Sequence, residues 1–296
     1  MTSLKDLKDR TRSIKSTSKI TQAMKLISAS RYGKFSQQIK TADNYTAQLL
    51  ESLKRVYYAD KLIFKELKNS FTHKNGKDGV LLLVFGSDRG LCSTFNINII
   101  KALKRKLLEY NKQKTAYKIV CYGKKVWQYV EKNYQIHLRE GNPMASNKSV
   151  YTDAYSVTLQ LATDLLNLLK TNQFSACDVI YTDYISALTM NVEVERILPT
   201  EKSMFTAGYD TDVYSFDNSL QDTFCNIVTQ LFSAYFHKFY LNSITSEYAS
   251  RMIAMDNATN NAKNLLVDLK MEYNRKRQTY ITKELIEIIT GAETVS

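Results

Sequence analysis

The sequence predicts an α/β domain of mostly parallel sheet, combined with two long terminal helices that form an antiparallel coiled coil. No Gly or Pro occurs between Gly208 and Gly291, and no Gly precedes Gly33 at the amino end. Both stretches therefore lack the residues that most readily end a helix. Between them, short apolar runs alternate with amphipathic segments, a pattern typical of a sheet with helices packed against it. The hydrophobic content of 44% is enough for a packed core.

The amino-terminal helix is expected to run from about Leu4 to about Tyr58. Ser3 followed by Asp6 forms a plausible cap for its first turn. Apolar residues recur along it and predict one buried stripe. The stripe consists of Leu4, Leu7, Ile14, Ile20, Met24 and Ile27, with Ala23 and Ala29 beside it.

The central segment predicts a Rossmann-like arrangement of four strands and their helices. Val80–Phe85 is a wholly apolar run, as expected of a strand that is buried on both faces. The turn-rich segment 68–79 before it reads as a loop. The further elements expected in chain order are helix 96–110, strand 118–122, helix 124–133, amphipathic helix 151–170, strand 178–186 and strand 189–198.

The carboxyl-terminal helix is expected to begin near Ser219 and Asp222 and to run for about 70 residues, roughly 100 Å at 1.5 Å per residue. Within it, residues spaced alternately by 3 and 4 define a seam of period 3.5, which requires a partner helix. The obvious partner is the amino-terminal helix, beyond whose end the carboxyl-terminal helix would continue alone. The seam consists of Met252, Met255, Thr259, Ala262, Leu266, Leu269 and Tyr273.

The predicted organisation is therefore one coiled-coil helix at residues 1–60, a central α/β domain at 77–208 and a second coiled-coil helix at 215–292. The formal net charge is +12, and residues 1–40 alone carry ten basic and two acidic residues, a net charge of +8. A helix with this charge suits nucleic acid, an acidic membrane surface or an acidic protein cavity.

No site for catalysis, a cofactor or a metal is expected. The four Cys residues lie far apart without a CxxC pair, and the three His residues have no partner at metal or catalytic-triad spacing. Residues 86–90 follow a buried strand but lack the spacing of a P-loop or a GxGxxG motif, so a tight strand-to-helix turn is preferred. Neither a signal peptide nor a membrane-spanning run is evident, and a cytoplasmic location is expected.

Three motifs carry a resemblance to the γ subunit of F-type ATP synthases. The carboxyl-terminal helix contains the blocks SE, AMDNAT, NA, YNxxRQ, IT, EL, EI and GA between Ser246 and Ala292. The amino-terminal block is SIKSTSKITQAMKLISASR, residues 13–31, and the central block is SDRGLCSTFN, residues 87–96. The motifs occur in the order found in that family, and they cover both ends and the middle of the chain.

The resemblance implies a non-catalytic rotor shaft inside a ring of alternating α and β subunits, with one copy per complex. It also implies an ε-type stalk subunit and a proton ring as partners, at the cytoplasmic face of the cell membrane. Arg277 and Gln278 match residues through which the family's shaft hydrogen-bonds a β-subunit loop, and Thr282 is a nearby polar partner. The remaining predicted partner contacts are Lys19, Met24, Lys25 and Arg31, on the basic amino-terminal helix.

Other hypotheses remain open at this stage. A basic coiled coil could bind nucleic acid, although residues 1–31 contain no aromatic side chain for base stacking. A small α/β enzyme is supported by fold alone. Asp217 and Asn218 stand where the family usually carries Glu-Pro, which leaves room for a paralogous ATPase head that drives a device other than a proton ring.

Overall fold

The computed structural model describes residues 3–59, 79–137, 163, 174, 176–198 and 220–293. These residues divide between two compact units, one formed by residues 1–30 with 251–296 and the other by residues 31–250. The elements are α1 (Leu4–Ala59), β1 (Gly79–Phe85), α3 (Phe95–Lys112), β2 (Ala116–Tyr122), α4 (Lys124–Tyr134), the 3-10 turn η1 (Gln135–His137), β3 (Ala176–Tyr184), β4 (Met190–Leu198) and α6 (Leu220–Glu293).

The two terminal helices are as long as the sequence predicts. Helix α1 spans 56 residues and α6 spans 74. The expected cap of α1 is a reciprocal capping box, in which the Asp6 amide donates to Ser3 Oγ and the Ser3 amide donates to Asp6 Oδ2. The hydrogen bonds from Ser3 are the main reason that the pKa of Asp6 is lowered. Among the described residues no helix is long and apolar enough to cross a membrane.

The sheet has the strand order β2-β1-β3-β4, so β1 lies between two parallel neighbours. Strand β4 pairs antiparallel with β3 and closes one edge. The sheet is thus mostly parallel, as predicted, with one antiparallel edge strand. Every residue of β1 is buried, whereas β4 alternates between exposed and half-buried residues over most of its length.

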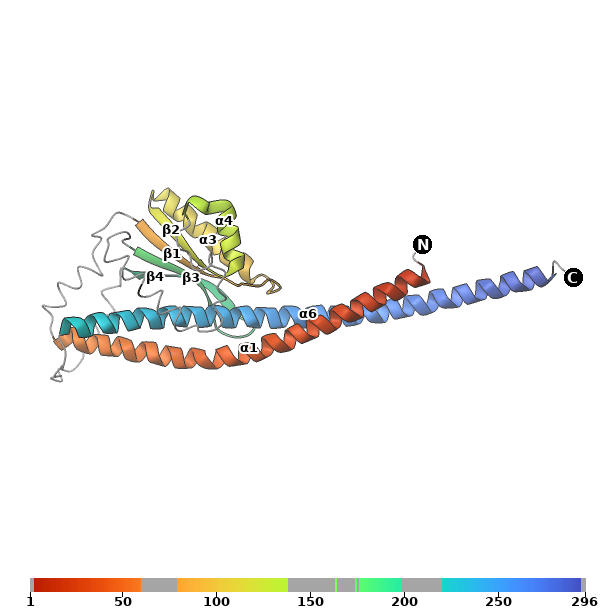
Figure 1. Cartoon of the computed structure of the whole chain (residues 1–296), viewed down its shortest axis with the longest axis horizontal. Coiled ribbons are helices and arrows are strands. Elements are labelled where there is room, and N and C mark those ends of the chain that lie inside the picture. Colours follow the sequence, from red (N-terminus) through yellow and green to blue (C-terminus); the bar gives the residue numbers. More distant parts are fainter. Residues whose placement is uncertain are drawn as a thin grey trace. The chain divides into compact units, whose positions relative to one another are not determined.

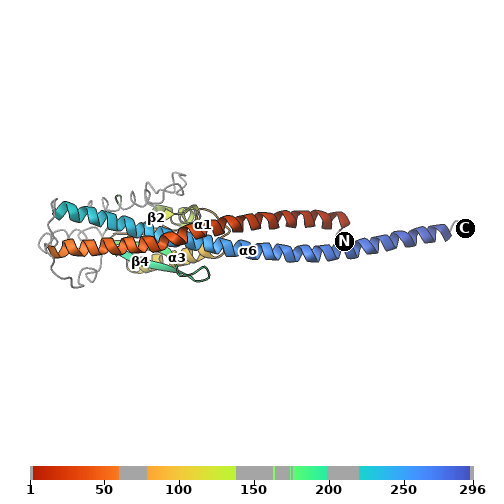
Figure 2. The same cartoon turned by 90° about the horizontal axis from the view of Figure 1, so that it is seen from below.

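Helices cover both faces of this sheet (Figure 1). On one face α3 and α4 pack against Val80, Leu82 and Val84 of β1. On the other face the alternate β1 residues, Leu81, Leu83 and Phe85, pack against the part of α1 and α6 that belongs to the same unit. There the two helices run side by side, α1 in orange and α6 in cyan, as Figure 2 also shows.

A buried carboxylate ties α3, β3 and β4 together. Asp178 is 1% exposed and accepts a hydrogen bond of 2.5 Å from the Tyr110 hydroxyl. Arg196 donates to the same carboxylate from Nε at 2.7 Å and from a terminal nitrogen at 3.0 Å. Burial raises the pKa of Asp178, but the hydrogen bonds from Arg196 and Tyr110 outweigh it, so that the pKa is lowered overall.

Three expectations lie outside the described residues and are left as predictions. They are the loop predicted at 68–79, except that Gly79 begins β1, the amphipathic helix at 151–170, of which only residue 163 is described and is helical, and the structural setting of Asp217 and Asn218. The other predicted strands and helices are present, with ends that differ by a few residues at most.

Candidate functional site

The carboxyl-terminal seam predicted from the sequence is buried. Within the unit formed by residues 1–30 and 251–296, Met255, Thr259, Ala262 and Leu269 are each at most 6% exposed. Met252, Leu266 and Tyr273 are half-buried, and the residues between them are mostly exposed. The seam therefore follows the period of 3.5 that a left-handed pair of helices requires.

The buried stripe of α1 differs in part from the one that was predicted. Ile20 and Ile27 are 58% and 63% exposed, so their assignment to the buried stripe is wrong. Pairing with α6 imposes steps of 3 and 4 residues, and these place small polar side chains where larger apolar ones were expected. The buried or half-buried positions in residues 3–30 are Leu4, Leu7, Thr11, Ile14, Ser18, Thr21, Met24, Lys25, Ser28 and Ala29.

Polar contacts link the two helices and establish their antiparallel order. Lys25 forms an ion pair of 2.7 Å with Asp256, and the Thr259 hydroxyl donates to Thr21 Oγ1 at 2.8 Å. Both side chains of the ion pair are more than a third exposed, so solvent screening keeps it weak. The positive charge of Lys276 also contributes to the lowered pKa of Asp6, after the hydrogen bonds from Ser3. This places the start of α1 beside the later part of α6.

The three predicted contact residues of α6 lie beyond its paired part. Arg277, Gln278 and Thr282 are exposed, and every residue from 277 to 290 is exposed as well. The Thr282 hydroxyl donates to the backbone carbonyl oxygen of Gln278 at 2.9 Å, which is a bond within α6. The Arg277 side chain takes no part in this bond. These residues thus lie together on the unpaired end of one helix.

The four predicted contact residues of α1 have different surroundings. Lys19 is exposed, Met24 is half-buried, and Lys25 is already paired with Asp256. Arg31 is exposed and belongs to the unit formed by residues 31–250. Because Lys25 lies beside Asp256 while Asp6 lies near Lys276, Lys25 and Arg277 are separated by roughly 30 Å along the helix pair.

Exposed apolar side chains accompany both groups, and the sequence analysis did not identify them as functional. Helix α1 exposes Ile20, Leu26 and Ile27. The Tyr280 hydroxyl is hydrogen-bonded to Glu284, and this bond raises the pKa of Tyr280. The signal available in the sequence was that these residues, except Tyr280, lie off the 3.5-residue seam. The exposed large apolar side chains at the end of α6 are Tyr280, Ile281, Leu285, Ile286, Ile288 and Ile289.

The Ser87 amide in the turn after β1 is occupied by a side chain of the protein. The Ser87 amide donates to Asn96 Oδ1, and the Asn96 side-chain amide donates back to Ser87 Oγ at 2.6 Å. Asp88 Oδ1 accepts from the first amide of α4, that of Lys124, at 3.1 Å. The turn is therefore held by its own side chains, which agrees with the strand-to-helix interpretation.

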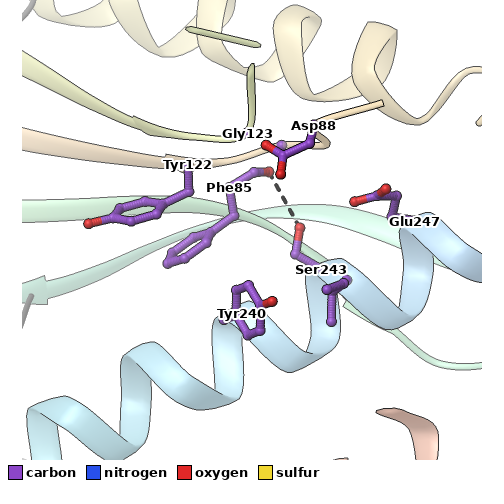
Figure 3. A pocket seen from close by; sticks show the side chains of 9 residues that line it. Phe85, Asp88, Tyr122, Gly123, Tyr240, Ser243 and Glu247 are labelled. Atoms are coloured by element: carbon purple, nitrogen blue, oxygen red, sulfur yellow. Dashed lines mark hydrogen bonds between the residues drawn. The ribbon is translucent and has the colours of Figure 1, made fainter. Parts of the chain in front are cut away.

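A small cavity lies beside this turn, between the ends of β1 and β2 and helix α6 (Figure 3). Its volume of about 30 Å³ suits a water molecule and is far too small for a nucleotide. Asp88 and Glu247 line it, and their carboxylates disfavour a phosphate group. Among the described residues no group of three or more His, Cys, Asp or Glu side chains is placed to hold a metal ion.

Comparisons with known proteins agree on one family. A family model described as ATP synthase matches residues 3–295. The ATP synthase gamma chain of Rickettsia felis is 31% identical over 304 residues, and that of Rhodospirillum rubrum is 32% identical over 304 residues. Each of these alignments covers 100% of both chains.

Solved structures share the fold. A chain from the central stalk and c-ring structure of Tetrahymena thermophila mitochondrial ATP synthase matches with a TM-score of 0.58 and 19% identity, over 81% of this chain and 99% of its own. A chain from the rotor of the Euglena gracilis mitochondrial ATP synthase matches with a TM-score of 0.59 and 16% identity. The match covers 94% of this chain and 98% of the Euglena chain. From its sequence relatives and its fold, this chain belongs to the gamma-chain family of F-type ATP synthases, the subunits of the central stalk.

Proposed function

We propose that the chain is the shaft of a rotary ATPase, with no catalytic site of its own, and that one copy enters each ring of α and β subunits. The observation that carries the proposal is the end of α6. Residues 277–290 are all exposed and bear large apolar side chains that the described chain does not cover. A helix of this kind is stabilised by packing, which a surrounding ring of subunits would supply.

The two groups of contact residues have separate roles in this proposal. Arg277, Gln278 and Thr282 would bind a β-subunit loop at the end of the shaft. The contact residues of α1 would meet the ring farther from the carboxyl end of α6, where carboxylates of the ring would complement the basic α1. They are Lys19, Met24, Lys25 and Arg31. One asymmetric shaft cannot make the same contacts with three β subunits at once, so each turn would change the state that each site favours.

The remaining parts of the assignment are also proposals. Residues 1–60 and 215–292 would form the shaft, and residues 77–208 the domain that meets an ε-type stalk subunit and a proton ring at the cytoplasmic face of the membrane. The alternative is a paralogous head that drives a different device. Affinity purification of the tagged chain from membranes distinguishes them: α and β subunits without any ring component would favour the paralogue.

Reconstitution with the cognate α and β subunits tests the shaft. The isolated chain should hydrolyse no ATP, and the assembled complex should contain one copy per ring. Arg277→Ala should lower ATPase turnover roughly tenfold or more, because it removes a charged hydrogen bond worth about 1.5–3 kcal/mol. The matched control is Lys283→Ala, which removes a cation from the same exposed end of α6. Among the described residues, the Lys283 ammonium group pairs with Glu287, at 3.6 Å.

Two results would contradict the proposal. Turnover by the isolated, contaminant-free chain would assign it a catalytic site. Equal turnover for Arg277→Ala and Lys283→Ala in the assembled ring would show that Arg277 is only a solvated side chain.

A further inference from the structure

A second concentration of positive charge, outside the basic amino-terminal segment of the sequence, lies in the unit formed by residues 31–250, named the sheet unit. Residues 95–137 contain ten basic and two acidic residues, a net charge of +8. They form α3, β2, α4 and η1, and the two helices cover one face of the sheet. The basic side chains that are exposed here, named the basic face below, are Lys101, Lys104, Arg105, Lys112, Lys114, Lys124, Lys125 and Lys132.

The basic face is not neutralised by the part of the chain that the structure describes. Of its charged side-chain groups only that of Lys104 has a specific contact among the described residues, with its Nζ 5.5 Å from the centre of the Tyr129 ring. One of the two acidic residues, Glu109, is paired with Lys106, which also lies 3.7 Å from the buried Asp178. Seven of these charges lie on α3 and α4, and Lys114 lies in the turn after α3. Like charges on one surface repel one another, so an anionic partner would stabilise this surface.

Apolar side chains are interspersed with these charges. Ile97 and Leu108 are 52% and 61% exposed. With Lys101, Lys104 and Lys112 they are spaced by 4, 3, 4 and 4 residues, which places all five along the outer side of α3. The opposite side of α3 is buried in the sheet unit. The outer surface of α3 therefore offers cations and exposed aliphatic groups together.

We propose that the basic face binds an anionic phospholipid surface. Seven of its eight cations are Lys, whose compact ammonium groups act as point charges and need no fixed geometry in a partner. Clusters of this size on a helix surface are typical of binding to acidic lipid headgroups. Ile97 and Leu108 supply aliphatic groups that can enter the headgroup region, as in helices that lie on a membrane.

Other anionic partners fit the surface less well. A single-stranded nucleic acid would require exposed aromatic platforms, but Trp127, Tyr129 and Tyr134 are half-buried against the apolar cluster under α3 and α4. A tightly bound acidic protein would favour Arg, which grips carboxylates with two parallel hydrogen bonds, and the basic face has only Arg105. The proposed function assigns the same domain to contacts with an ε-type subunit and a proton ring, so lipid binding is tested on the purified chain without those partners.

Flotation of the purified full-length chain with lipid vesicles tests the proposal. Vesicles of equal parts phosphatidylglycerol and phosphatidylcholine should carry the chain, and pure phosphatidylcholine vesicles should not. The variant Lys101→Glu/Lys104→Glu/Lys112→Glu should lower partitioning at least tenfold. The control Lys5→Glu/Lys8→Glu/Lys15→Glu makes the same change in net charge at exposed positions of α1 and should lower it less than threefold. Leu108→Ser should weaken binding without changing its dependence on salt.

Three results would overturn the proposal. The first is no flotation with anionic vesicles at physiological ionic strength, where the Debye length is about 8 Å. The second is an equal loss for the two triple variants, because net charge alone would then account for binding. The third is binding of a polyglutamate peptide or an RNA oligonucleotide that is tighter than vesicle binding and is lost in the α3 variant, which would identify an acidic macromolecule as the partner. Circular dichroism of both variants ensures that a loss of binding is not a loss of folding.

Discussion

Replacing Asp178 with Asn should destabilise the sheet unit by about 2–3 kcal/mol. Breaking a buried ion pair by removing one partner costs about 3–5 kcal/mol when both charges are buried. Here the carboxylate is 2% exposed but the Arg196 side chain is 50% exposed, so Arg196 can regain part of its hydration and the cost is reduced. Tyr110 keeps a hydrogen-bond acceptor in the Asn oxygen, although a weaker one than a carboxylate.

Urea unfolding followed by tryptophan fluorescence measures this effect. Trp127 is the single tryptophan of the chain, and it packs against the apolar clusters on both faces of the sheet, so its emission reports on the unit that contains Asp178. The matched control is Asp183→Asn, the same chemical change on the same strand at a half-buried position, which should cost less than about 0.5 kcal/mol. A loss below about 1 kcal/mol for Asp178→Asn would refute the argument that this carboxylate holds α3, β3 and β4 together.

The lowered pKa of Asp178 predicts that its contribution to stability depends on pH. Because the folded state lowers the pKa of Asp178 from its ordinary value of 3.8, its contribution to stability is complete above that pH. The contribution is lost as the pH falls below 3.8 and the carboxylate becomes protonated. The difference in unfolding free energy between the wild type and Asp178→Asn should therefore shrink on acidification through this range.

Three further predictions concern the same unit. Burial lowers the pKa of His237 from its ordinary 6.5, so the urea midpoint should fall as the pH drops below 6.5, and His237→Gln should flatten this slope. Gly123 has a φ of +105°, and a Cβ there would collide with the backbone of the turn after β1, so Gly123→Ala should cost about 3 kcal/mol or more by thermal melting. Gly90→Ala is the control, because the nearest atom to a Cβ there would be a side-chain carbon of Lys125, at 3.9 Å. Burial raises the pKa of the Cys121 thiol to about 12, whereas Cys225 is only half-buried, so an aromatic disulfide reagent should label Cys225 first in the native chain and Cys121 only after unfolding.

Elements with a strong local pattern could be predicted closely from the sequence. The uninterrupted apolar run of β1 was expected at residues 80–85 and is found at 79–85, because a strand buried on both faces needs such a run. The cap formed by Ser3 and Asp6 depends only on residues within one helical turn and was also predictable.

Features that depend on a distant partner could not be predicted in this way. Ser18 and Ser28 are buried in place of Ile20 and Ile27 because the spacing of α6, more than 200 residues away in sequence, determines which side of α1 is covered. The basic face was also missed, since its charges are separated along the chain and gather only when α3 and α4 cover the same sheet. The ion pair of Lys25 with Asp256 shows further that a cation assigned to a partner can already have a partner within the chain.

The polar seam between the two chain ends has a consequence for axial register. In a seam made only of Leu, one helix could slide past the other by a heptad and meet nearly equivalent contacts. Here such a shift would separate Lys25 from Asp256 and Thr21 from Thr259, and would leave buried hydroxyl groups beside apolar neighbours. The polar contacts of the seam thus favour one axial alignment of the two helices. A rod that transmits rotation needs this property, because slippage between its two strands would dissipate the twist before it reached the far end.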